Sequence, residues 1–239
     1  MKCLIIGNSH VGAIIKAYKE KKYEGLELDF LAMGGNLLLP QLEVTNSFSL
    51  GTQSQRIQSL LDNLELSESN NLDKYDYIIV YGCQLRSQGA GENWFKHISQ
   101  HNEQYSSQAW NVCMQDFILN SSHIAFLRQL AGVGNEQQLK KVISMPSPHP
   151  NERMLTKLRV NVSAQLSLQS AQTMSSEITK LGVCFLDTPC QLLNDEQVAT
   201  RAEFLSETEE DYSHLNTKGG HVVITYLIDY LSCKKSSYS

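Results

Sequence analysis

The feature that most constrains the fold is a unit that recurs along the chain: a short apolar run, a turn with glycine, then helical hydrophobic spacing. Residues 2–6 read Lys-Cys-Leu-Ile-Ile and end at Gly7, and apolar residues then recur at helical spacing over residues 11–22. A continuous apolar run is typical of a strand in a parallel sheet, because such strands are covered on both faces. The start of the chain therefore predicts a strand, a tight turn and a helix.

The same unit returns further along the chain. Four more strands are predicted, at Leu26–Met33, Tyr77–Tyr81, within Leu139–Met145, and at Val183–Asp187. Helical spacing predicts helices at Arg56–Leu64, Leu155–Leu181 and His221–Leu231. Strands that alternate with helices imply right-handed crossovers, so the predicted fold class is α/β, a three-layer α/β/α sandwich with a five-stranded parallel sheet.

Length and charge narrow the class of protein. With 239 residues, one well-buried α/β core is expected, as a single domain over residues 1–233 with a disordered tail over residues 234–239. A formal net charge of −5 argues against a nucleic-acid partner, which would require a basic surface. No oligomeric state is predicted.

The sequence shows no membrane-spanning segment, no secretory segment and no metal-ligand spacing. No apolar stretch approaches the ~20 residues of a membrane helix, and the N-terminus lacks a secretory apolar segment, so a cytoplasmic protein without membrane insertion is expected. Histidines, cysteines and acidic residues show no metal-ligand spacing. We therefore expect no metal and no cofactor.

A serine follows the first strand directly, in the turn that opens the first helix. Ligand crevices in parallel sheets lie outside the carboxyl ends of the strands, so Ser9 is expected at that edge, with its N–H at a helix N-terminus. A hydroxyl placed there can attack a carbonyl carbon, and the neighbouring N–H can hold the resulting oxyanion. Taken alone, Ser9 is better explained as a helix N-cap, because such caps are common.

Two other motifs fit this segment poorly. The dinucleotide fingerprint G-x-G-x-x-G requires a glycine where Ser9 stands. The nucleophile elbow G-x-S-x-G requires a glycine where Val11 stands. A nucleotide-binding domain and an α/β-hydrolase elbow are therefore not favoured.

Near the other end of the chain, Asp211 and His214 lie three residues apart. In a helical turn this spacing places both side chains on one face. A carboxylate beside an imidazole fixes its tautomer and stabilises the imidazolium formed during proton transfer, which is the assistance a serine nucleophile needs. By itself the spacing is common, and a surface turn explains it as well.

Together, these features resemble the SGNH (GDSL-like) hydrolase superfamily, and the resemblance covers most of the chain. Residues 7–10, Gly-Asn-Ser-His, are similar to the first block of the family, with Asn8 in place of the usual aspartate. Residues 34–36, Gly-Gly-Asn, are similar to the second block, whose glycine gives an N–H to the oxyanion hole; Gly35 is aligned to it, with Gly34 as the alternative.

The remaining blocks match unequally. Asp211 and His214, followed by Leu-Asn-x-x-Gly-Gly over residues 215–220, are similar to the fifth block. The third block, usually Gly-x-Asn, reads Gly-Cys-Gln over residues 82–84. Gln84 carries an amide one methylene longer, so the third oxyanion donor departs from the family pattern.

The resemblance implies a flavodoxin-like fold and a serine hydrolase. The residues implied are Ser9 as nucleophile, His214 as general base and Asp211 as its orienting partner; Ser9, Gly35 and Gln84 in the oxyanion hole; and His10 and Asn36 at the substrate. The predicted function is cleavage of a carboxylic ester, such as an O-acetyl group on a sugar or glycan, with a small-molecule or glycan ester as partner. The alternatives are an acyltransferase that uses the same triad, and a non-catalytic binding module on this fold.

Two histidines near the predicted site have a second interpretation. His10 is explained equally well as a surface histidine that caps the first helix. His149 lies in the proline-rich loop after the fourth strand and is expected to be exposed.

Overall fold

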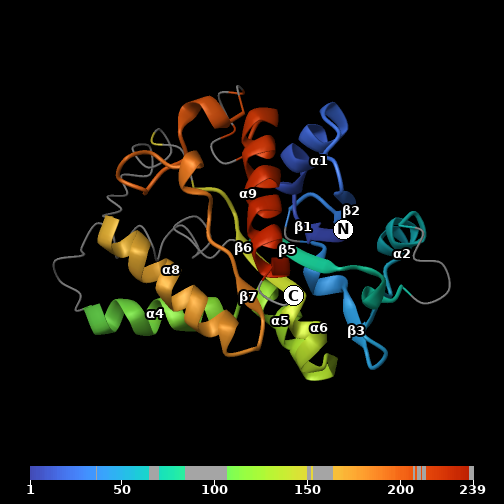
Figure 1. The fold of residues 1–239 in the computed structure, drawn as a ribbon. Coiled ribbons are helices and arrows are strands. Elements are labelled where there is room, and N and C mark those ends of the chain that lie inside the picture. Colours follow the sequence, from blue (N-terminus) through green and yellow to red (C-terminus); the bar gives the residue numbers. More distant parts are fainter. Residues whose placement is uncertain are drawn as a thin grey trace.

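The computed structural model describes residues 1–35, 37–64, 70–83, 107–149, 152, 164–206, 208, 211 and 214–236. Its centre is a five-stranded sheet in the order β2-β1-β5-β6-β7, with every neighbouring pair parallel (Figure 1). The strands are β1 (Lys2–Gly7), β2 (Glu27–Ala32), β5 (Tyr77–Cys83), β6 (Val142–Pro146) and β7 (Cys184–Phe185). The predicted parallel sheet is confirmed, and its strand order is the flavodoxin-like one.

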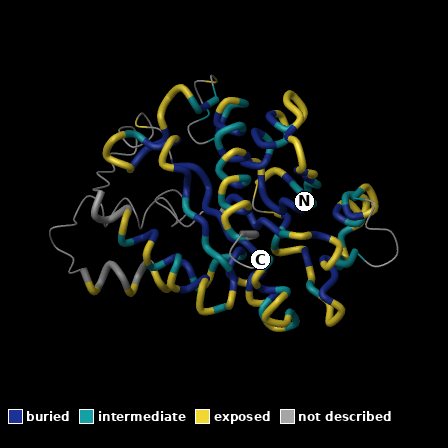
Figure 2. Tube along the Cα trace, viewed as in Figure 1, coloured by how far each residue is buried: buried dark blue, intermediate teal, exposed yellow. Residues whose placement is uncertain are grey.

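Helices cover both faces of this sheet. One face is covered by α1 (Val11–Glu20) and α9 (Thr217–Ser236). The other is covered by α2 (Gln55–Asp62), α4 (Ser107–Leu119), α5 (Ser122–Val133), α6 (Glu136–Lys140) and α8 (Ala164–Thr179). The three-layer sandwich is therefore confirmed, and the sheet between the layers is buried (Figure 2).

The two-residue period of β1 produces these two cores. Cys3 and Ile5 pack on the side of α1 and α9, whereas Leu4 and Ile6 pack on the opposite side. All four side chains have 0% exposure. A strand that is apolar on both faces is thus explained by a helix layer on each side.

Several elements were not predicted, and the last helix extends beyond both of its predicted ends, His221 and Leu231. A small antiparallel hairpin, β3 (Glu43–Thr45) with β4 (Ser49–Gly51), and the helices α4, α5 and α6 had no clear sequence signal. The helix α9 runs to Ser236, so the disordered tail predicted from residue 234 is wrong for its first three residues. Lys234 anchors this last turn because its Nζ donates to Lys140 O at 3.3 Å and to Cys184 Sγ at 2.7 Å.

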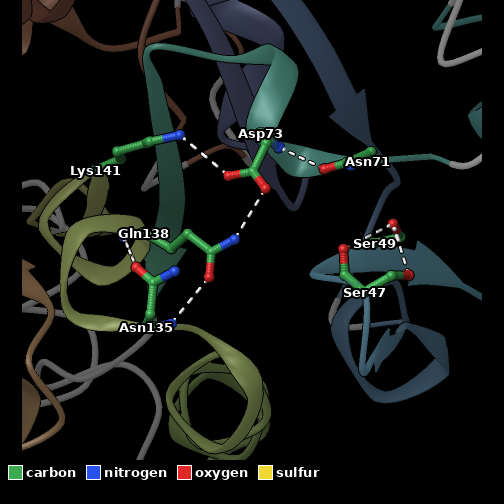
Figure 3. A network of polar contacts seen from close by, with 7 residues as sticks. All are labelled: Ser47, Ser49, Asn71, Asp73, Asn135, Gln138 and Lys141. Atoms are coloured by element: carbon green, nitrogen blue, oxygen red, sulfur yellow. Dashed lines mark hydrogen bonds and ion pairs between the residues drawn. The ribbon is translucent and has the colours of Figure 1, made fainter.

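The amino edge of the sheet is tied to the helix layer by a polar network (Figure 3). Asp73, just before β5, accepts hydrogen bonds from Gln138 Nε2 at 2.9 Å and Lys141 Nζ at 3.2 Å. Gln138 also forms a capping box with Asn135 at the start of α6. These contacts hold the loops that precede β5 and β6, at the edge opposite to Ser9.

The carboxyl edge contains the point at which the strand order reverses. Gly7, the last residue of β1, pairs with Ala32 of β2 on one side and Tyr81 of β5 on the other. A Cβ on Gly7 would lie 2.3 Å from Tyr81 O, so only glycine allows the two strands to approach this closely. The carboxyl ends of β1, β2 and β5 therefore lie side by side, where α/β sheets commonly bind ligands.

No helix among the described residues is both long and apolar enough to cross a membrane.

Candidate active site

The structure brings Ser9, His214 and Asp211 together, as the sequence predicted. Ser9 Oγ lies 2.7 Å from His214 Nε2, although the two residues are 205 positions apart. His214 Nδ1 lies 2.7 Å from Asp211 Oδ1. Ser9 is exposed, and the side chains of His214 and Asp211 retain 37% and 26% of their accessible surface. The three side chains form a hydrogen-bonded chain that ends at a hydroxyl open to solvent.

The partners of His214 determine its tautomer. A carboxylate only accepts hydrogen bonds, so Nδ1 of a neutral His214 carries the proton and donates it to Asp211. Nε2 is then the unprotonated nitrogen and accepts the hydroxyl proton of Ser9. This is the arrangement a general base requires before it removes that proton.

The positions of Asp211 and His214 are fixed by backbone contacts. Asp211 Oδ1 also accepts the backbone N–H of His214 at 3.0 Å, which fixes the carboxylate relative to the backbone of His214. Asn216 caps α9, because its Oδ1 accepts the N–H of Gly219 at 3.0 Å. The Nδ2 of Asn216 donates to Leu205 O at 3.0 Å and to Glu203 O at 2.8 Å. Asn216 therefore ties the start of α9 to the segment that contains Glu203 and Leu205.

Asn8 joins β1 to β5 beneath Ser9. Its Nδ2 donates to Gly82 O at 2.9 Å, and its Oδ1 accepts the N–H of His10 at 3.1 Å. An ionised aspartate has no proton to donate to Gly82 O, so the asparagine makes a contact that an aspartate at this position could not. The departure from the usual first block is thus explained by a bond between two strand ends.

Gly82 is constrained by this contact, and we predict that Gly82→Ala is destabilising. Gly82 has φ +89°, and a Cβ there would lie 2.4 Å from Asn8 Oδ1. The substitution therefore combines backbone strain with a clash, and we expect it to lower the free energy of unfolding by about 2 kcal/mol. Urea unfolding measures this change.

Gly132→Ala is the matched control. Gly132 lies in α5, and a Cβ there would meet nothing within 4 Å. Because alanine is the better helix former, this variant should be unchanged or slightly more stable, by at most about 1 kcal/mol. Equal effects of the two substitutions would contradict the explanation given for Gly82.

His10 is buried beside His214 and does not cap α1 through its side chain. It has 3% exposure, so the alternative of a surface cap is wrong. The two imidazole rings stack with centroids 4.6 Å apart and planes 28° from parallel. Burial, and secondly the charge of the nearby His214, lower the pKa of His10 to about 4. His10 is therefore neutral at the pH at which His214 would act as a base.

The predicted oxyanion donors are only partly described. Gly35 follows β2 at the same edge as Ser9, has φ +70° and is exposed. The N–H of Met33 donates to Gly7 O at 3.2 Å, which holds the start of this loop against the end of β1. Within the described part of the chain, the N–H groups of Ser9 and Gly35 have no acceptor. Gln84 and Asn36 lie outside the described residues, so their assignments stay predictions.

Two other histidines belong to the interior. His149 has 2% exposure, and its Nδ1 lies 3.1 Å from Val198 O, so the predicted exposed position is wrong. The loop that carries Val198 also covers it, since Thr200 Oγ1 donates to His149 O at 2.6 Å. His123 contacts Ser144 Oγ at 2.8 Å, but Ser144 has 0% exposure. That Ser–His pair cannot be reached by a substrate.

Comparison with solved structures finds proteins of the class that the sequence resembles. The chain is similar to a GDSL-like lipase from Bacteroides thetaiotaomicron, with 10% identity, TM-score 0.46, and coverage of 98% of this chain and 88% of that one. It is similar to the lipase/acylhydrolase from Enterococcus faecalis, with 9% identity, TM-score 0.44, and coverage of 98% and 97%. The periplasmic domain of a lipopolysaccharide acetyltransferase from Salmonella ser. Paratyphi A gives 13% identity, TM-score 0.45, and coverage of 96% and 83%.

No protein-family model matches the chain, and no curated protein sequence matches it. The fold of the chain is α/β, with the five-stranded parallel sheet and the sheet edge described above. At these identities and TM-scores the matched structures carry no information about the substrate of this chain. What the site can do must follow from its own atoms.

Proposed function

We propose that this protein is a serine esterase of the SGNH type, with Ser9 as the nucleophile. The observation that carries the proposal is the hydrogen-bonded chain from Asp211 through His214 to the exposed hydroxyl of Ser9. A nucleophile bonded to a base, and a base oriented by a third group, is the arrangement that activates a serine. Two segments of the sequence, 205 positions apart at Ser9 and His214, converge to form it.

Acylation follows from this geometry. His214 Nε2 removes the proton of Ser9 Oγ as that oxygen forms a bond to the acyl carbon of the ester. The carbonyl electron pair moves to its oxygen, which the N–H groups of Ser9 and Gly35 are proposed to hold. The oxyanion then collapses, the ester C–O bond breaks, and the leaving alcohol takes the proton from His214. Asp211 stabilises the imidazolium that exists between the two transfers.

Deacylation repeats these steps with water. His214 removes a proton from a water molecule, whose oxygen attacks the acyl carbon, and Ser9 leaves with that proton. A sugar hydroxyl in place of water would make the same site an acyltransferase. The substrate we propose is a small acyl group, such as acetyl, on a sugar or glycan. A non-catalytic binding module is disfavoured because it has no need of a base aligned on an exposed hydroxyl.

The direct test is covalent labelling. A fluorophosphonate probe should label the wild-type protein at one serine, and peptide mass spectrometry should place the adduct on Ser9. Activated phosphonates react with serines whose hydroxyl proton is removed by an adjacent base, so the label reports the function of the Ser9–His214 pair.

Ser144 supplies the matched control. It also contacts a histidine, but it is fully buried. Labelling should therefore be lost in Ser9→Ala and kept in Ser144→Ala. An unlabelled wild-type protein, or an adduct that persists in Ser9→Ala, would overturn the proposal.

A further inference from the structure

The ring that stacks on His214 has no assigned role in the proton transfers described above. We propose that His10 is a positioning residue, whose neutral ring supports one face of His214 and keeps Nε2 directed at Ser9. The inference rests on the proposed function, because it concerns the same base. It replaces the earlier prediction that His10 contacts the substrate.

The two rings differ in how firmly they are held. The side chain of His214 is 37% exposed, whereas His10 has 3% exposure. The backbone N–H of His10 is bonded to Asn8 Oδ1, and Asn8 Nδ2 is bonded to Gly82 O on β5. His10 is thus attached to the end of the sheet, and the more exposed imidazole rests on the better-fixed one.

Stacking restricts a motion of the His214 ring that its hydrogen bonds allow. Its two nitrogen contacts, to Asp211 and Ser9, lie at opposite ends of the ring. Two such contacts permit the ring to tilt about the line that joins them. A flat neighbour with centroids 4.6 Å apart, at 28° from parallel, opposes this tilt. The direction of Nε2 therefore depends on His10 as well as on Asp211.

The surroundings of His10 favour a neutral ring. Its Nδ1 is buried and has no partner among the described residues, so an imidazolium would bury an N–H without an acceptor. A cation there would also repel the imidazolium that His214 becomes during catalysis. The neutral ring instead presents its π face to that cation, which is an attractive arrangement. The lowered pKa of His10 agrees with this assignment.

Three substitutions of His10 separate support by a ring from contact through a polar atom. His10→Phe keeps a flat ring and removes both nitrogens. His10→Gln keeps polar atoms and removes the ring, and His10→Leu removes both features while filling the space. For p-nitrophenyl acetate, we expect Leu and Gln to lower kcat about 10-fold with KM within about twofold, and Phe to stay within about threefold of wild type. Ser9→Ala is the reference for loss of the nucleophile.

The alternatives give different results. A raised KM in His10→Phe together with wild-type kinetics in His10→Gln would show a substrate contact and overturn the inference. Wild-type kcat in His10→Leu would overturn it too. Should the Leu variant fail to fold, the Phe and Gln pair decides the matter, since thermal unfolding shows which variants are native. Wild-type turnover in Ser9→Ala would refute the proposed function itself, whereas a dead Ser9→Ala with a fully active His10→Leu would refute this inference alone.

Discussion

Ser9→Ala should lower kcat for p-nitrophenyl acetate by at least about 10³-fold, because the acyl-enzyme can form only through Ser9 Oγ. KM should change little, since alanine removes one exposed oxygen and no bulk. The residual activity of Ser9→Ala should come from substrate binding and the oxyanion donors, which act without a nucleophile. Steady-state rates at saturating ester, with enzyme concentration set by active wild-type sites, measure the effect.

The stability of the Ser9→Ala variant is the control for this experiment. Ser9 is exposed and its hydroxyl contacts only His214 among the described side chains, so the free energy of unfolding should stay within about 0.5 kcal/mol of wild type. A native, inactive variant locates the chemistry at Oγ. A native variant that retains turnover would show that another group performs the hydrolysis.

The sequence predicted the parts of the site that follow from strand ends. Ser9 comes directly after a buried strand, and its motif and that of Asp211 and His214 stand in a fixed order along the chain. Because ligand crevices in parallel sheets lie at the carboxyl edge, Ser9 could be placed there from its strand alone. Asp211 and His214 follow no strand directly, so their meeting with Ser9 was implied only by the resemblance to the SGNH family.

The structural features that the sequence did not predict depend on contacts between distant segments of the chain. The burial of His149 comes from a loop some fifty residues later that contains Val198 and Thr200, as their separations of 49 and 51 positions show. The last turn of α9 is held by Cys184, which is 50 positions away. The stacking of His10 on His214 likewise has no local signal. Periodicity reports which face of an element is apolar, but it does not report which loop will cover that element.

Substitution of Asp211 should also lower kcat strongly, and Asp211→Asn and Asp211→Ala should differ in the size of that loss. Both the backbone N–H and the Nδ1 of His214 contact the same atom, Asp211 Oδ1, at 3.0 Å and 2.7 Å. In Asp211→Asn the backbone N–H requires an acceptor, so it should hold the amide oxygen, and not the NH₂ group, in that place. The oxygen then still accepts from Nδ1, and His214 keeps the tautomer that leaves Nε2 free to act as base.

Asp211→Asn should therefore lose the negative charge and keep the orientation of His214. We expect kcat to fall about 10²-fold, equivalent to about 3 kcal/mol of stabilisation of the imidazolium. Asp211→Ala loses the orientation as well, and its kcat should fall about 10⁴-fold. Parallel measurements of kcat for both variants test the difference. Equal losses would mean that the amide of Asn turns its NH₂ group toward Nδ1 of His214 and imposes the wrong tautomer. In that case the backbone N–H of His214 does not control the orientation of the side chain at position 211.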